Sequence, residues 1–512
     1  MNTLPRQRRL FGRIRNITAL RKVSTVFLSV LTLFSVAVAL IALRPAAASR
    51  PGVEDGLYQQ ARLSESVSLH ASEIGNSNIS LSDGRRVITD YRGPRELIEA
   101  MVQDTARPLS LASGDFDRDG VMDLIGGYAM PGGGVIAYHR GNHDSIYPNS
   151  LEAQLRRSEG KSNDAPFVSP GYVFSIPGPA DFIRAGDFDA DGNLDVLAAS
   201  RGGEHLYLLS GDGRGQFKEA EEINLPGRVS ALEAGDINRR DGLDDVVVCV
   251  VTAHGAQALV FEGPEGALRA DPEVFALPAE ASGLAVGQLN KDGKGDIVVA
   301  AGRDLVVIEG RDRKLSLSIE EQSKANPARP QIHSFSFDIK AVQLGDFTGR
   351  RQTDVALLAG DGSIIILSKG ENKGRSLPLS RWKQERLSGS GKEMVKAGVS
   401  SLPADDLLVL GERGVQIIIH SRREREEEIN GNKVLLVEEG QREQVLLAAE
   451  AEPVAALAMR LNGDAIDDLV MLMAGRSAAI VAPSVNGAII TVNTNLDTNE
   501  RDNVLTLREA IL

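Results

Sequence analysis

The residues best suited to chemistry are carboxylates spaced two positions apart in two short segments, DFDRDGVMD and DFDADGNLD. Asp stands at positions 1, 3, 5 and 9 of each segment, as Asp115, Asp117, Asp119 and Asp123 in the first and Asp187, Asp189, Asp191 and Asp195 in the second. Alternate spacing turns several oxygens toward one point. Gly at position 6 permits a sharp turn and leaves one further ligand at position 7, the carbonyl oxygen of Val121 or Asn193. Hard oxygen donors in a flexible loop select calcium over zinc, copper and magnesium, so we expect Ca²⁺ here.

An EF-hand begins with the same residue types, but its twelfth position excludes it. That position should be a bidentate Glu that starts a helix. Here it is Gly126 or Ala198, and each lies within an apolar run typical of a β-strand. We therefore expect the two loops to join strands. The alternative is that they are ordinary turns rich in Asp and Gly.

Two further loops carry partial ligand sets. The third has one extra residue, and its candidate ligands are Asp236, Asn238, Asp241 and Asp245. The fourth has Gln288 at position 1, and its candidate ligands are Asn290, Asp292 and Asp296. Three later loops have lost most of these residue types, so we assign no metal ligands to them.

These loops belong to a pattern found seven times: a Gly, a polar cluster of about nine residues ending in Asp, and then an apolar run, with the last two copies eroded. The closing Asp falls at positions 123, 195, 245, 296, 354, 406 and 468. Each unit also contains other short apolar stretches ended by turns, such as residues 205–217. Several short strands in about 50 to 60 residues are typical of a propeller blade. The sequence predicts an all-β fold, a seven-bladed β-propeller; an array of β-sandwiches is the structural alternative.

At these motifs, GDFDADG followed by LDVL and GDGRGQF, the chain resembles the FG-GAP/VCBS repeat family, which includes the propellers of integrin α-subunits. The resemblance covers residues 105–483. It implies a propeller of seven blades in which the carboxylates named above ligate calcium. Residues 484–512 form a linker and a segment that resembles the start of a CSLREA domain, and we expect this segment to be truncated.

The N-terminus has the features of an export signal. Residues 1–48 carry eight positive charges and no acid, an uncharged apolar run spans residues 23–43, and small residues follow at Ala46 to Ala48. We expect residues 1–48 to be a signal peptide or an N-terminal signal anchor, and residues 49–104 to be an N-terminal segment able to complete a blade. In either case the chain would be extracytoplasmic, secreted or at the cell surface.

Charge and motifs limit the function classes. Loss of residues 1–48 would change the formal net charge from -13 to -21, which argues against nucleic acid or anionic lipid as a partner. The only cysteine, Cys249, lies in an apolar run and is expected to be buried. No catalytic motif is present, so we expect a non-enzymatic binding or adhesion module for an unknown protein or glycan. A polysaccharide lyase or glycan hydrolase on the same scaffold, or a structural spacer, remains the alternative.

Overall fold

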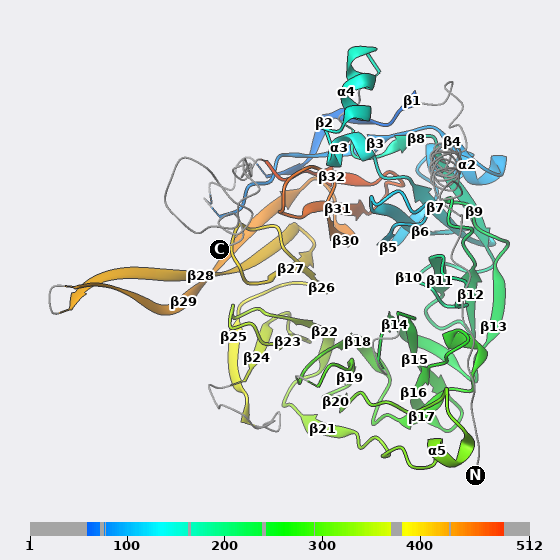
Figure 1. Cartoon of the computed structure of the whole chain (residues 1–512), viewed down its shortest axis with the longest axis vertical. Helices are drawn as coiled ribbons and strands as arrows, with labels where there is room; N and C mark the ends of the chain where they lie inside the picture. Colours follow the sequence, from blue (N-terminus) through cyan, green and yellow to red (C-terminus); the bar gives the residue numbers. More distant parts are fainter. Residues whose placement is uncertain are drawn as a thin grey trace, which may run out of the picture. The chain divides into compact units, whose positions relative to one another are not determined.

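The computed structural model describes residues 59–71, 76, 78–161, 165–237, 242–290, 292–369, 381–429 and 432–485. The expected export signal and the CSLREA-like segment lie outside these residues. Within them the chain is almost entirely β-structure, arranged as a series of antiparallel sheets (Figure 1).

Each of the first five copies of the repeat builds one sheet of antiparallel strands that succeed one another along the chain. The first sheet contains β5 (Arg107–Gly114), β6 (Asp123–Met130), β7 (Gly133–His139) and β9 (Gly171–Ile176), with β4 (Tyr91–Arg92) parallel to β9 at its edge. The second contains β10 (Phe182–Gly186), β11 (Asp195–Ala199), β12 (His205–Leu209) and β13 (Glu221–Asn224). The third contains β14 (Arg228–Gly235), β15 (Asp245–Thr252), β16 (Gly255–Phe261) and β17 (Glu273–Ala276).

The later repeats continue the series. The fourth sheet contains β18 (Ala281–Gly287), β19 (Asp296–Ala301), β20 (Asp304–Ile308) and β21 (Gln331–Ser334). The fifth contains β22 (Ile339–Gly345), β23 (Asp354–Ala359), β24 (Ile364–Ser368) and β25 (Lys383–Leu387). The sixth repeat forms β26 (Glu393–Ala397), β27 (Asp406–Gly411), β28 (Gly414–Ile429) and β29 (Asn432–Ala449), and the seventh forms β30 (Pro453–Met459), β31 (Asp468–Met473) and β32 (Ile480–Ala482).

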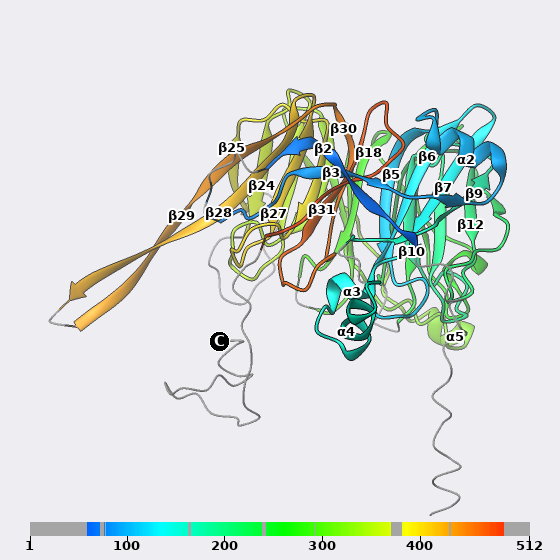
Figure 2. The same cartoon turned by 90° about the horizontal axis from the view of Figure 1, so that it is seen from above.

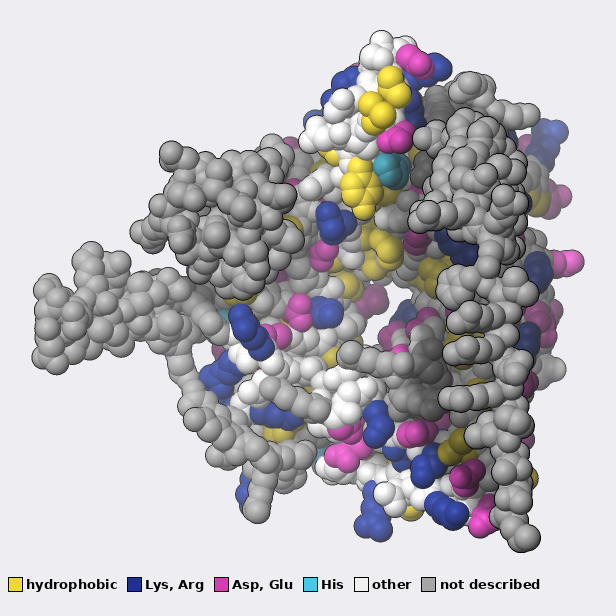
Figure 3. Space-filling view, in the orientation of Figure 1, with side chains coloured by type: hydrophobic (Ala, Val, Ile, Leu, Met, Phe, Trp, Pro, Cys, Tyr) yellow, Lys and Arg dark blue, Asp and Glu magenta, His cyan; other side chains and the backbone are white. Residues whose placement is uncertain are grey.

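The sheets surround a central opening. Within the described residues, the first strand of each repeat contacts the first strand of the next, in the cyclic order β5, β10, β14, β18, β22, β26, β30 and back to β5. A cavity of about 740 Å³ is lined by residues from every one of these strands, and the opening is visible through the middle of the molecule (Figure 3). The prediction of an all-β β-propeller is confirmed. These seven inner strands equal in number the repeats counted in the sequence.

The second strand of each repeat lies between two neighbouring sheets, which explains the uninterrupted apolar runs after each closing Asp. Such a strand is covered on both faces, so its side chains need not alternate between apolar and polar. In β11, β19 and β23 every residue is buried. Cys249 lies in the corresponding strand β15 and is buried, as predicted.

N-terminal strands extend the sheet of the last repeat. β3 (Gly84–Ile88) pairs with β32 through Arg85 and Arg86, and β2 (Arg62–His70) pairs with β3. The end of β2 also pairs with β29, so the strands of the sixth and seventh repeats form one continuous sheet. Strands contributed by residues far apart in sequence thus connect the first part of the chain to the last repeat.

Short helices occupy some of the connections between strands. They are α2 (Arg95–Val102), α3 (His143–Ile146), α4 (Leu151–Ser158), the 3₁₀ helix η1 (Ala267–Arg269) and α5 (Ile319–Gln322). The segment at residues 139–171 contains α3 and α4, whose first turns are capped by the side chains of Asn142 and Ser150. It also contains β8 (Val168–Ser169), which pairs with β1 (Gln59–Gln60).

The long hairpin of β28 and β29 extends away from the other sheets (Figures 1 and 2). No helix in the described part of the chain is both long and apolar enough to cross a membrane.

Candidate metal centre

The Asp loops connect the first and second strands of each repeat, and all lie at the same end of their hairpins. The closing Asp is the first residue of the second strand, and it pairs with the last residue of the first strand, as Asp123 does with Gly114 and Asp195 with Gly186. The same register recurs for Asp245, Asp296, Asp354, Asp406 and Asp468. The repeated strand pairing therefore fixes where each loop sits.

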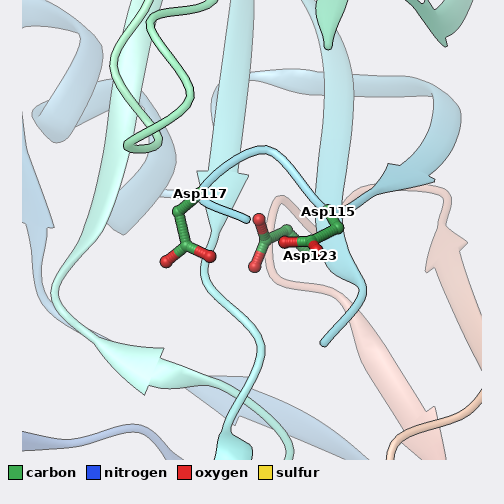
Figure 4. A group of neighbouring side chains, drawn as sticks. All are labelled: Asp115, Asp117 and Asp123. Atoms are coloured by element: carbon green, nitrogen blue, oxygen red, sulfur yellow. The ribbon is translucent and has the colours of Figure 1, made fainter. Parts of the chain in front are cut away.

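In the first loop, Asp115, Asp117 and Asp123 have carboxylate oxygens within 4.8 Å of one another, and the three side chains converge above the strand ends (Figure 4). Asp115 Oδ1 and Oδ2 accept the backbone N–H groups of Asp119 (3.0 Å) and Gly120 (3.0 Å). These bonds hold the loop tightly wound. Gly120 has a φ of 85°, a conformation that glycine adopts without strain.

The second loop repeats this geometry. Asp187, Asp189 and Asp195 form the corresponding group within 4.8 Å. Asp187 accepts the N–H groups of Asp191 (3.2 Å) and Gly192 (2.9 Å), and Gly192 has a φ of 81°. The structure thus brings together positions 1, 3 and 9, as the spacing predicts.

Position 5 does not join either group of three carboxylates. Asp119 Oδ1 and Asp191 Oδ1 instead accept the N–H groups of the residues two positions later, Val121 (2.9 Å) and Asn193 (2.8 Å). Each position 5 carboxylate therefore helps to shape the turn.

The third and fourth loops are less complete. Asn238 and Asp241 lie outside the described residues, whereas Asp236 and Asp245 lie within them, and Asp245 accepts the N–H of Ile237 (2.8 Å). In the fourth loop, Asn290 Oδ1 accepts the N–H of Asp292 (3.0 Å). A third carboxylate is lacking there because the sequence has Gln288 and Asn290 at positions 1 and 3.

The closing Asp has a structural task that sequence reasoning missed. Its carboxylate is buried and accepts the N–H at position 2 or 3 of its own loop, in every repeat from the first to the seventh. Asp195, for example, accepts the N–H of Phe188 (3.0 Å) and of Gly211 (2.9 Å), which lies just beyond the third strand. The signal was the survival of this Asp in repeats whose other ligands are lost. A carboxylate has about four lone-pair sites, so these bonds leave room for a metal.

A second missed feature is the Asp that precedes the closing Asp in three repeats. Asp405 Oδ2 accepts the N–H of Asp346 (2.7 Å) and Asp467 Oδ2 accepts the N–H of Gly398 (3.0 Å), so each reaches the loop of the preceding sheet. Asp244 accepts the N–H of Asp187 in the same way. The Asp–Asp doublet was the visible signal. These side chains fasten neighbouring sheets to each other.

The first two loops differ in the side chain that lies beside position 3. Arg140 forms ion pairs with Asp117 and with Asp119, the second at 2.9 Å from Nη2. At the same place in the second loop, the hydroxyl of Ser210 donates to Asp189 (3.1 Å). Arg140 and Ser210 each precede the glycine whose N–H donates to the closing Asp, Gly141 to Asp123 (2.7 Å) and Gly211 to Asp195 (2.9 Å).

The crowding of carboxylates perturbs their proton affinities. Burial, with smaller contributions from the charges of Asp189 and Asp191, raises the pKa of Asp195 to about 7 against the lowering effect of the backbone N–H groups. Burial, together with the charge of Asp117, raises the pKa of Asp123 to about 8. Each group therefore favours either a proton or another positive charge in its place.

Charged side chains also meet in the central cavity. Arg184 on β10 pairs with Glu233 on β14 (Nη2 to Oε2, 2.8 Å), and Arg201 and Glu393 line the same space. His139 ends β7 and is buried, and burial lowers its pKa to about 4.

Comparison with known proteins agrees with the fold. Residues 187–248, which include the second and third loops, match the family model described as an FG-GAP-like repeat. No curated protein sequence matches the chain.

Two of the similar solved structures are crystals of BBS1N in complex with ARL6DN. The one soaked with lead is 12% identical with a TM-score of 0.43, and it covers 74% of this chain and 92% of its own. The one soaked with mercury is 10% identical with a TM-score of 0.45, and it covers 80% of this chain and 97% of its own. The CSLREA resemblance finds no counterpart in these comparisons. The chain is a β-propeller protein that contains an FG-GAP-like repeat.

Proposed function

We propose that this protein is an exported, calcium-binding β-propeller that acts as a secreted or cell-surface binding module, with calcium bracing its loops. The observation that carries the proposal is the group formed by Asp187, Asp189 and Asp195, whose oxygens lie within 4.8 Å of one another. Asp191 and the carbonyl oxygen of Asn193 are the further expected ligands. A bound Ca²⁺ would supply the positive charge that neutralises these carboxylates.

The residues of the second loop fit calcium. The donors are all oxygen, which suits a hard cation that takes six to eight oxygen ligands. Asp187 is held by the N–H groups of Asp191 and Gly192, so the position 1 carboxylate is positioned before any metal arrives. Close carboxylates repel one another without a cation, and removing calcium should therefore destabilise the fold.

The test is thermal unfolding of the full chain with calcium and with chelator. A ligand present at about 100 times its Kd stabilises a fold by about 2.7 kcal/mol. The entropy of unfolding of a chain of this size is about 1 kcal/mol per kelvin, so we expect the melting temperature to rise by roughly 3 °C. Asp189→Asn should lose most of this rise. Asp212→Asn is the matched control, because Asp212 lies in an exposed turn of the same sheet and accepts the N–H groups of nearby backbone. A wild-type chain that melts identically with calcium and with chelator would refute calcium binding.

We expect the binding partner to be a protein or a glycan. The support is the acidic net charge of -13, which disfavours nucleic acid, together with a scaffold that presents many loops. A binding screen against glycans and extracellular matrix proteins, run with calcium and with chelator, tests this assignment. Absence of binding to either class in both conditions would refute it.

A glycan lyase or hydrolase is the second candidate. The observation that favours it is the meeting of Arg184, Arg201, Glu233 and Glu393 in the central cavity, where charges from several sheets converge. Incubation with acidic and neutral polysaccharides, with measurement of new reducing ends and of unsaturated products, distinguishes the candidates. Glu393→Gln should abolish any cleavage found, since the amide cannot transfer a proton.

A further inference from the structure

We propose that Arg140 is a built-in replacement for calcium in the first loop, so that the second loop binds the ion and the first does not. This inference rests on the proposed function, since it concerns which loop takes the same ion. It departs from the sequence-based assignment, in which the first two loops have equivalent ligand sets.

The two loops share three features of their geometry, and they differ in the side chain beside position 3. In both loops, three carboxylates have oxygens within 4.8 Å of one another, and the position 1 carboxylate accepts two backbone N–H groups. Both loops also have a glycine with positive φ at position 6. The difference is Arg140 against Ser210. Each lies just beyond the third strand of its sheet and approaches the position 3 carboxylate.

Arg140 occupies the side of the carboxylates that a cation would need. Its guanidinium pairs with Asp117 and Asp119, two of the five expected ligands of the first loop. A guanidinium is planar, keeps its charge under all ordinary conditions and makes strong charge-assisted bonds to carboxylates. Calcium could enter only by displacing Arg140 from both Asp residues, and it would then sit beside an unpaired positive charge.

Ser210 has the opposite effect in the second loop. Its hydroxyl is uncharged, and its bond to Asp189 at 3.1 Å orients that carboxylate without neutralising it. The guanidinium of Arg140 thus pairs with carboxylates of the first loop, whereas the residue in the same place in the second loop brings no positive charge.

The experiment exchanges the two residues and counts bound ions. Calcium is titrated into the calcium-depleted full chain by isothermal calorimetry. The number of ions bound per chain is then compared between each variant and wild type. We expect that Arg140→Ser adds one ion per chain, that Ser210→Arg removes one, and that the double exchange restores the wild-type number. Arg140→Lys keeps the charge, and it should leave the number unchanged.

Unfolding in chelator provides a readout that does not depend on calcium binding. Without the ion, Arg140→Ser should melt below wild type because the first loop has lost the cation that pairs with it, and calcium should restore the loss. Terbium luminescence on the same variants checks that a gained ion lies at the exchanged loop, since Tyr138 donates a hydrogen bond to Asp123 and lies close enough to sensitise it.

The outcomes separate the two proposals. If wild type binds no calcium, the proposed function fails and the inference fails with it. If wild type binds calcium but Arg140→Ser gains no ion, or if Ser210→Arg loses none, calcium binding stands and the role of Arg140 is refuted. A folded Arg140→Ser variant with one additional ion supports the inference.

Discussion

Replacement of Asp406 by Ala tests whether the closing Asp holds the fold where no metal is expected. Asp406 begins β27 and is fully buried, and its loop carries none of the other carboxylates of the ligand pattern at positions 1, 3 and 5. Its carboxylate accepts the backbone N–H of Ser400 (2.7 Å) and the hydroxyl of Ser400 (2.7 Å). Asp406→Ala removes both acceptors.

The size of the effect can be worked out from these two bonds. A buried donor left without an acceptor costs about 1 to 3 kcal/mol. The hydroxyl can turn to another acceptor, but the backbone N–H cannot move, so we expect a loss of about 3 kcal/mol in the free energy of unfolding. Part of the cost is offset because the buried charge is removed, as the raised pKa of Asp406, about 6, indicates.

Urea unfolding monitored by circular dichroism measures this loss. Because the loop lacks the ligand pattern, the loss should be equal in calcium and in chelator. Glu412→Ala is the control, since Glu412 is exposed in the following turn of the same sheet and its ion pair with Lys392 is a surface one; the expected change is under about 0.5 kcal/mol. A loss under about 1 kcal/mol for Asp406→Ala, or one that appears only with calcium, would refute the structural role of the closing Asp.

Two further predictions use other buried carboxylates. Burial raises the pKa of Asp354 to about 6, so the folded state binds a proton more tightly than the unfolded state between pH 4 and pH 6. In chelator, this group should lower the free energy of unfolding by about 2 kcal/mol as the pH rises through this window. Asp354→Asn should remove that share of the pH dependence measured by urea titration at several pH values, and an unchanged dependence would refute the assignment. Asp405→Ala removes the acceptor for the N–H of Asp346 in the preceding sheet and should lower the free energy of unfolding by about 1 to 2 kcal/mol. Amide hydrogen exchange at Asp346 should become faster. Unchanged exchange there would argue that the two sheets are held together by apolar packing alone.

The fold was predictable because one local sequence pattern, which indicates a loop followed by a buried strand, recurs along the chain. Closing Asp residues such as Asp195 and Asp354 mark the start of the buried second strands, and the apolar runs after them have the length of strands. Position 1 and position 3 ligands such as Asp187 and Asp189 were equally visible, since nearby residues in a short loop have few ways to arrange themselves.

The features that sequence could not predict depend on contacts between residues that are distant in the chain. Arg140 lies 21 residues beyond its partner Asp119, across two strands, and nothing in its immediate neighbours indicates where its side chain reaches. Helices α3 and α4 were also missed, because their short polar sequences carry too few apolar residues to show a helical period. The contact of Arg140 is tertiary information, whereas the two helices were too short to show a local pattern.

The pairing of β3 with β32 has a consequence for how the protein is made. Arg85 and Val481 are partners in one sheet, yet almost 400 residues separate them, so this contact cannot form until synthesis has passed residue 481. Contacts between such distant residues form slowly, because the chain loses the entropy of closing a long loop before the contact stabilises it. During that interval β32 has an unpaired edge, and unpaired strand edges invite association with other chains. The newly made chain would therefore be most vulnerable to aggregation just before its ends meet.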